Sequence, residues 1–450
     1  MDALAGPGPH AADRAGGAAG EGCVLVIKLL SPNMIRNGLS LYLIQFANFM
    51  LPLLALPYLT RQLGMAAFGV FSVMSAYLQY AAIITDYGFS LSATRYVSVN
   101  RESPQKISLA FSAILIIKLF LSLISLLAIL VVIYISDFLV DFRTPFAFIS
   151  LATWIFGLAL FPLWLFQGFE TTVVPSVINF AFKLSILVCL FLFITPGSSP
   201  VSVVFVYGVL YFVSGFFGMI SAMRRFKLKL LIVKYTDLHL FIVEGWSIFV
   251  SSFFSNVLTG SGIIIASAFL PKEVVGGYSV IDKLAKAANS LLQPYSQAIF
   301  PRIAKSFSKS YSRGLLEVKK FGLPFVGIGV AVCLLFIFFG PDVTEIIFGK
   351  GYEGFDAGLS IFGVWLFFGV LCNILGIQIM VNLGKTSRYA VMFFISGALS
   401  TGLNIIFINT LGYISIPSSL LIGEMLLCTM SLQWFLKYSK EMGIHESRVL

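Results

Sequence analysis

Long apolar runs constrain this chain more than any other feature. About 20 apolar residues in a helix cross a bilayer core roughly 30 Å thick, and about twelve such runs follow one another. Runs such as 114–135 do not alternate in polarity, so they indicate helices rather than barrel strands. With 11% charged residues, against about 25% in soluble domains, a soluble fold is excluded. We expect spans at 39–60, 68–93, 108–136, 145–166, 174–194, 201–222, 241–268, 274–299, 321–340, 358–381, 389–410 and 414–436.

The basic residues between the runs predict which side each loop faces. With the N-terminus in the cytoplasm, cytoplasmic segments hold 22 of the 30 Lys and Arg residues, outer loops hold 4, and 4 lie inside spans. Cytoplasmic loops of membrane proteins carry the excess of Lys and Arg. The pattern therefore predicts a multi-pass plasma-membrane protein with both termini in the cytoplasm. It also assigns the net charge of +10 to membrane topology and not to nucleic-acid binding.

Cysteine and histidine usage argues against most enzyme chemistry. No two of the five Cys form a CxxC pair, and none of the three His lies inside an apolar run. A thiolate or histidine metal site and a bound haem are therefore not expected. No loop between the spans is long enough for a catalytic domain, so we expect neither an enzyme nor a cofactor.

The first 33 residues differ from the rest. Residues 1–22 are rich in Ala, Gly and Pro without apolar periodicity, which is typical of disorder. We expect 1–33 to be a disordered tail, or an appended segment with the native start at Met34.

An internal repeat organises the spans. A shift of 207 residues brings Gly69 onto Gly276 and Arg95 onto Arg302, at equivalent points of spans 1–2 and 7–8. Six spans separate the copies, and an even number preserves orientation, so the repeats are parallel. We expect an all-α membrane protein of about twelve transmembrane helices in two six-helix lobes, 34–230 and 231–450, with a substrate site between them.

Polar stripes run along four of the predicted helices. Positions three and four residues apart share a helix face, and such stripes occur on spans 1, 2, 7 and 8, which suggests a shared wet cavity. Hydrogen bonding between helices is the alternative reading. The candidate cavity residues of this kind are Gln45, Asn48, Gln79, Asn289 and Gln293.

Lysines inside the spans are the most specific indication of what the cavity binds. A cation at the bilayer centre costs at least about 2.5–3.5 kcal/mol unless it faces water or a partner. Since these lysines outnumber the intramembrane acids, chiefly Asp86 and Asp282, the cavity favours an anion such as phosphate. Snorkelling or pairing with the acids is the alternative. Asp86, Asp282 and Glu244 are candidates for ion coupling. The candidate anion-binding lysines are Lys118, Lys183, Lys283 and Lys286.

Several motifs resemble polysaccharide flippases of the Wzx type, within the multidrug/oligosaccharidyl-lipid/polysaccharide exporter superfamily. They are the runs 56–64, 86–89 and 93–95, then 275–279, 283–284, 301–302 and 348–352. The resemblance covers about residues 34–440. It implies a two-lobed inner-membrane transporter that moves an undecaprenyl-pyrophosphate-linked oligosaccharide, such as an O-antigen repeat unit, to the outer leaflet. It also implies the polymerase and chain-length regulator of that pathway as partners. On this reading Arg95 and Arg302 receive the head group first.

Three alternatives stay open at this point. A multidrug cation antiporter of the same superfamily would prefer an acidic cavity. A major-facilitator carrier also has six plus six spans, but 95–106 lacks its loop signature. A membrane glycan polymerase or acyltransferase would need longer outer loops or intramembrane histidine.

Overall fold

The computed structural model describes residues 32–171, 173–349 and 351–449, and the side chains of residues 51, 53–171, 173–349, 351–352 and 354–441. Of the expected tail, residues 1–31 lie outside the described part, and Pro32 and Asn33 already belong to the first helix. All regular elements in the described part are helices. They are α2 (Pro32–Asp86), α3 (Phe89–Val99), α4 (Pro104–Ile135), η1 (Asp137–Phe142), α5 (Pro145–Leu160), α6 (Leu163–Gly168), α7 (Val173–Phe193), α8 (Pro200–Arg225), α9 (Tyr235–Gly260), α10 (Gly262–Phe269), α11 (Lys272–Phe307), α12 (Tyr311–Phe338), α13 (Gly340–Phe348), η2 (Glu353–Phe355), α14 (Asp356–Cys372), the π-helix η3 (Asn373–Val381), α15 (Thr386–Leu411), η4 (Gly412–Ile414) and α16 (Ser415–Val449).

Length and hydropathy confirm an all-α membrane protein. Nine helical stretches of the described chain are long and apolar enough to cross a membrane. Two of them, Leu53–Val99 and Thr386–Glu441, have 47 and 56 residues. The first contains the end of the predicted span 39–60 and all of 68–93, and the second contains both 389–410 and 414–436. Helix α11 holds the predicted span 274–299 but is too polar along its length to be among the nine. The count of twelve stays a prediction.

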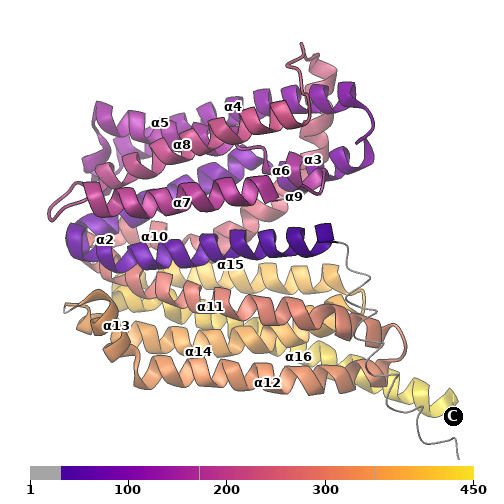
Figure 1. The fold of residues 1–450 in the computed structure, drawn as a ribbon. Coiled ribbons are helices and arrows are strands. Elements are labelled where there is room, and N and C mark those ends of the chain that lie inside the picture. Colours follow the sequence, from indigo (N-terminus) through magenta and orange to yellow (C-terminus); the bar gives the residue numbers. More distant parts are fainter. Residues whose placement is uncertain (1–31, 172, 350, 450) are drawn as a thin grey trace, which may run out of the picture.

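The helices lie side by side in two groups (Figure 1). Those of the first half, in indigo and magenta, lie above α11 to α16, in orange and yellow, while α9 lies in the upper group beside α3. Helices α5 and α8 pack together in the upper group, and α12, α14 and α16 pack together in the lower one. The halves meet mainly through α2 and α11, while α9 packs against α3 and α4 of the first half and α15 of the second.

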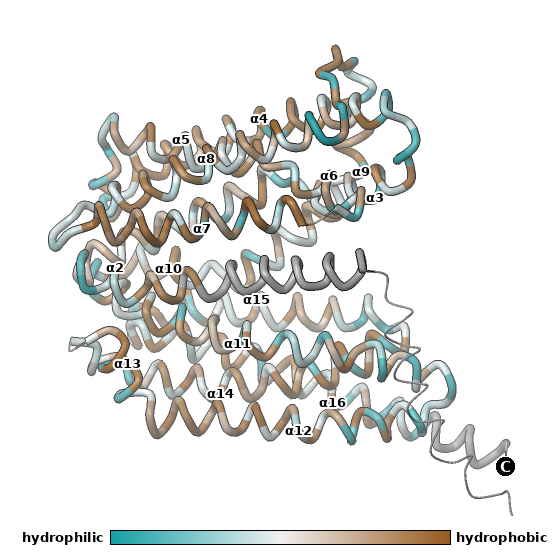
Figure 2. The backbone as a smooth tube through the Cα atoms, in the orientation of Figure 1, coloured by the Kyte–Doolittle hydropathy of each residue, from teal (hydrophilic) through white to brown (hydrophobic). Residues whose placement is uncertain are grey.

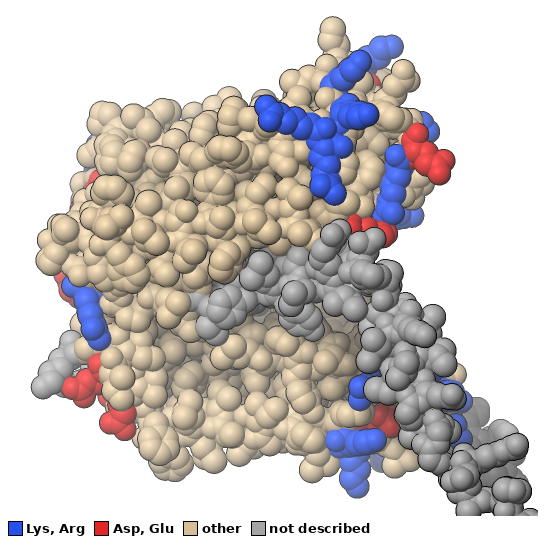
Figure 3. Space-filling model, viewed as in Figure 1, with Lys and Arg blue, Asp and Glu red and all other residues tan. Residues whose placement is uncertain are grey.

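The polarity of the residues changes along the length of the helices. Figure 2 shows apolar residues along the middle of the helices and hydrophilic residues toward their ends. In Figure 3, most Lys and Arg on this face gather at the end of the bundle where the C-terminal helix also ends. An apolar band between polar ends is what a bilayer requires of a bundle of helices.

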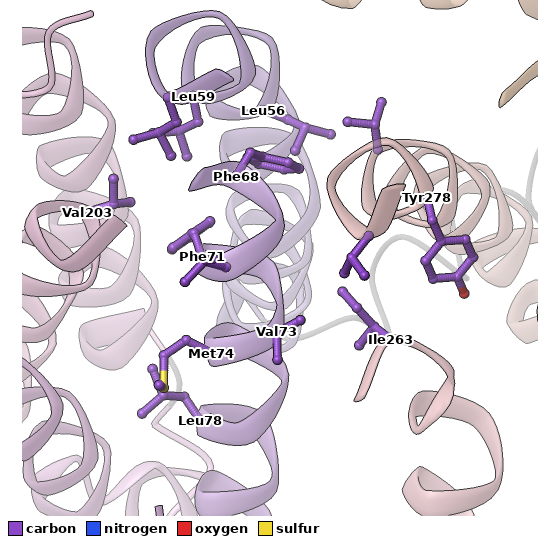
Figure 4. Close-up of a cluster of buried hydrophobic side chains, with 14 of the residues drawn as sticks. Leu56, Leu59, Phe68, Phe71, Val73, Met74, Leu78, Val203, Ile263 and Tyr278 are labelled. Atoms are coloured by element: carbon purple, nitrogen blue, oxygen red, sulfur yellow. The ribbon is translucent and has the colours of Figure 1, made fainter. Parts of the chain in front are cut away.

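Two breaks shape the helices beside the site. Gly64, with φ 73° and ψ 170°, interrupts the helical backbone of α2 between the two predicted spans. This combination of φ and ψ is essentially limited to glycine. A turn at Tyr87 and Gly88, both with positive φ, separates α2 from α3. Between these breaks, α2 carries much of the apolar core (Figure 4): Met74 and Leu78 lie on its side facing α8, and Val73 lies toward α10 and α11.

Candidate functional site: a polar cavity between two repeated helices

The approach of α2 to α11 positions the site. A Cβ atom on Gly276 would collide with the carbonyl of Met65, and one on Gly69 would collide with the carbonyl of Lys272. Only glycine at both positions allows the two backbones to come this close. These two glycines are equivalent under the 207-residue repeat, so the repeat brings corresponding points of the halves into direct contact.

A cavity of about 450 Å³ opens beside this contact. Two of the predicted polar stripes line it: Ser72, Ser75 and Gln79 from α2, and Asp282, Lys286 and Asn289 from α11. Helix α9 adds Asn256 and Thr259, and α15 adds Ser396 and Ser400. The rings of Phe362, Trp365 and Phe393 complete a wall that combines aromatic faces with hydrogen-bonding groups.

Lys286 presents a cation to this cavity. Its Nζ lies 2.8 Å from Oδ2 of Asp282, one helical turn earlier, and its side chain is 48% exposed against 7% for Asp282. The hydroxyl of Tyr278 donates to the other oxygen of Asp282 at 3.3 Å. The carboxylate is thus fixed from two sides, while the ammonium keeps donors directed to the open space.

Lys283 lies deeper, at the interface of the halves. Its Nζ donates to Oγ of Ser72 at 3.2 Å and lies 4.7 Å and 5.2 Å from the ring centroids of Phe68 and Phe71. Aromatic faces attract a cation electrostatically, so α2 holds this α11 lysine with one hydroxyl and two phenylalanine rings.

The other two predicted lysines line a different cavity. Lys118, Lys183 and Asp86 face a space of about 260 Å³ within the first half, together with Asn179 and Ser214. Lys118 is buried, and its Nζ lies 3.9 Å from Oδ1 of Asp86. The four lysines therefore fall into two pairs and do not converge on one chamber as the sequence had suggested.

Four of the remaining predicted site residues do not line either of these two cavities. Arg95 and Glu244 are exposed on α3 and α9, and Gln293 is exposed on α11. Arg302 is exposed near the end of α11, 5.6 Å from the ring centroid of Phe321. Gln45 and Asn48 lie on α2, but their side chains are outside the described part of the chain.

Glu424 is a cavity residue that the polar stripes did not indicate. This α16 residue lines the larger cavity, and its carboxylate interacts with the side chains of Cys372 and Trp365. An acid inside the predicted span 414–436 was the available signal. With Asp282 it formally balances Lys283 and Lys286, so the expected surplus of positive charge is confined to the smaller cavity.

Polar contacts join the two halves at the end opposite the basic one. Lys272 of α11 pairs with Asp141 of η1 at 2.8 Å. Arg61 of α2 donates to the carbonyls of Ile346 and Ile347 in α13, at 3.4 Å and 3.2 Å. Together with the contact of Gly69 and Gly276, these bonds close this end of the interface.

Two solved structures share the fold of this chain. The lipid II flippase MurJ in an inward closed conformation is 12% identical, with a TM-score of 0.64 over 90% of this chain and 87% of MurJ. An inward-facing multidrug resistance transporter of the MATE family, in the MOP superfamily, is also 12% identical, with a TM-score of 0.63 over 85% and 96% of the two chains. At such identities the likeness establishes the fold alone.

The family model described as polysaccharide biosynthesis protein matches residues 34–307, and the chain belongs to this family. A protein of Shigella dysenteriae named as an O-antigen transporter is 29% identical, over 71% of this chain and 79% of its own length. One of Escherichia coli K12 with the same name is 27% identical, over 81% and 88%. The resemblance inferred from the sequence motifs is thereby confirmed.

Proposed function

We propose that the protein is a flippase that translocates undecaprenyl-pyrophosphate-linked oligosaccharide repeat units, of O-antigen or a related glycan, from the cytoplasmic to the outer leaflet. The observation that carries the proposal is the larger cavity, in which Lys286 offers a half-exposed cation beside amide, hydroxyl and aromatic side chains. Ammonium groups suit phosphate oxygens, and the other groups suit sugar hydroxyls and ring faces. The names of the two bacterial relatives support the same substrate class.

The predicted site residues take different roles in this proposal. Lys286 and Lys283 hold the pyrophosphate, with Gln79 and Asn289 against the sugars. Lys118 and Lys183 form a second binding site for the pyrophosphate. The exposed Arg95 and Arg302 attract the head group at the inner surface. Further hydrogen bonds to the sugars come from Gln45, Asn48 and Gln293. Asp282 and Asp86 couple movement to an ion gradient, because each is paired with a lysine that the cargo would engage. Glu244 remains a third candidate for that coupling.

Alternating access is the mechanism that fits this arrangement. Parallel repeats of six spans, divided near residue 230, would rock about the α2–α11 contact. In this proposal, the bonds of Lys272 with Asp141 and of Arg61 with α13 join the halves at the outer end and would have to break when that end opens. In this proposal the protein lies in the bacterial inner membrane with both termini in the cytoplasm, and it delivers cargo to a polymerase and a chain-length regulator.

Removal of the Lys286 charge tests the proposal. We predict that Lys286→Gln lowers surface glycan at least tenfold in a flippase-deficient strain, because a hydrogen bond to a charged group contributes about 1.5–3 kcal/mol. Lys286→Arg keeps the charge and should retain part of the activity. Lys319→Gln, which removes an exposed lysine of α12, is the matched control. Full glycan display by Lys286→Gln, at equal protein level in the membrane, would count against the assignment.

A multidrug cation antiporter of the same superfamily is the second candidate. Asp282 and Glu424 in the larger cavity favour it, because carboxylates attract cationic drugs. Drug-susceptibility measurements beside glycan complementation separate the two. Drug resistance conferred without restoration of surface glycan would favour the antiporter.

A further inference from the structure

The connection between α8 and α9 forms a basic strap, which we define as residues 226–234. Together with the last turn of α8 it carries five cations within eleven positions, and no acid occurs from residue 224 to residue 236. The five are Arg224, Arg225, Lys227, Lys229 and Lys234, and all are exposed.

The strap is fastened along the first turns of α4. The backbone N–H of Lys229 donates to Oγ of Ser108 at 3.3 Å, and that of Leu231 donates to Oγ of Ser112 at 2.9 Å. Leu228 is buried in the core between these elements. At 1.5 Å per residue, the two serines lie roughly 6 Å and 12 Å from the start of α4. The strap therefore lies on the side of the bundle, beside a helix that crosses the membrane.

Apolar side chains project from this basic segment. Ile232 is 98% exposed, Leu230 is 62% exposed, and Tyr235, which begins α9, is 78% exposed. Aliphatic side chains held in this way by a fixed backbone are unfavourable in water. At a membrane surface they insert among the upper acyl chains, and tyrosine favours the same level.

We propose that the basic strap is a binding site for anionic phospholipid headgroups of the inner leaflet. Cations close to an anionic membrane surface each strengthen binding, roughly fivefold per Lys or Arg. Lysine can lay its aliphatic stem along apolar surface and keep its ammonium at the headgroups. The proposal is independent of the cargo, because the strap contributes no residue to either cavity.

Native mass spectrometry of the full-length protein tests the site. The purified protein is titrated with phosphatidylglycerol or with phosphatidylcholine of the same acyl chains, and retained lipids are counted. We expect the wild type to retain phosphatidylglycerol preferentially. The variant Lys227→Gln/Lys229→Gln/Lys234→Gln should lose at least tenfold in apparent affinity for it. The variant Ile232→Ser, which keeps every charge, should lose affinity for both lipids.

A matched charge control decides whether the effect is local. Lys305→Gln/Lys309→Gln/Lys319→Gln removes three exposed lysines from the α11–α12 region and should leave retention within about twofold of the wild type. Equal losses in both triple variants would overturn the proposal in favour of a general effect of net charge. Unchanged retention in the strap variant would also overturn it. If that variant keeps its lipid but loses surface glycan, the strap contacts a protein instead.

Discussion

Single glycines decide how close the halves come. Gly69 and Gly276 face one another across the interface, and each leaves room for a backbone carbonyl of the opposite helix. Lys283 lies on the same stretch of α11 as Gly276, and its side chain contacts Ser72 and two phenylalanine rings of α2. The glycine contact therefore also sets the position of a cavity lysine. The sequence repeat identified the two glycines as equivalent, but it could not show that they touch.

Gly276→Ala should therefore weaken the protein at the interface. The added methyl group would collide with the carbonyl of Met65, and overpacking of this kind typically costs about 1–3 kcal/mol. We expect a lower midpoint of unfolding in detergent and reduced glycan display. Gly402→Ala is the control, because a Cβ there has no neighbour within 4 Å. An unchanged midpoint for Gly276→Ala would show that the two helices separate without cost.

Helix positions were largely predictable from the apolar runs, since a membrane accepts few other arrangements. The predicted spans 174–194 and 201–222 agree with α7 and α8 to within a few residues. The predicted span 145–166 agrees in the same way with the stretch Pro145–Gly168, which is interrupted between α5 and α6. The π-helix η3 and the continuation of α11 to Phe307 were not predictable, because they depend on tertiary packing and not on hydropathy. The division of the lysines between two cavities also escaped prediction, since sequence spacing gives the face of a helix but not its neighbour.

The break in α2 supplies a second prediction. Gly64→Ala should destabilise the protein by about 1–3 kcal/mol, because alanine is strained at this φ and ψ, although a Cβ there has no neighbour within 4 Å. Gly327→Ala, inside α12 and equally uncrowded, should instead stabilise by roughly 0.5–1 kcal/mol. Chemical denaturation in mixed micelles measures both. Equal changes in the free energy of unfolding for the two variants would mean that the backbone at residue 64 adopts another conformation at little cost.

At the scale of the whole molecule, the halves are joined at one end by side-chain bonds and glycine contacts, and a polar cavity lies beside that joint. Charged groups of this cavity come from α11 and α16, while α2 contributes neutral polar groups. In the proposed mechanism, an anionic cargo would compete with the carboxylate of Asp282 for Lys286, and the ion pair of these two residues lies in the wall of the cavity.

Transport in reconstituted vesicles tests directly whether the protein moves a lipid-linked glycan and whether it needs the charge of Lys286 to do so. The measurement follows transfer of an undecaprenyl-pyrophosphate-linked oligosaccharide between leaflets, with the wild type, Lys286→Gln and Lys319→Gln each inserted at equal density. We expect transfer by the wild type and by Lys319→Gln, and a rate at least tenfold lower for Lys286→Gln. Equal transfer by all three, or none by the wild type when the inserted protein is correctly folded, would contradict this expectation.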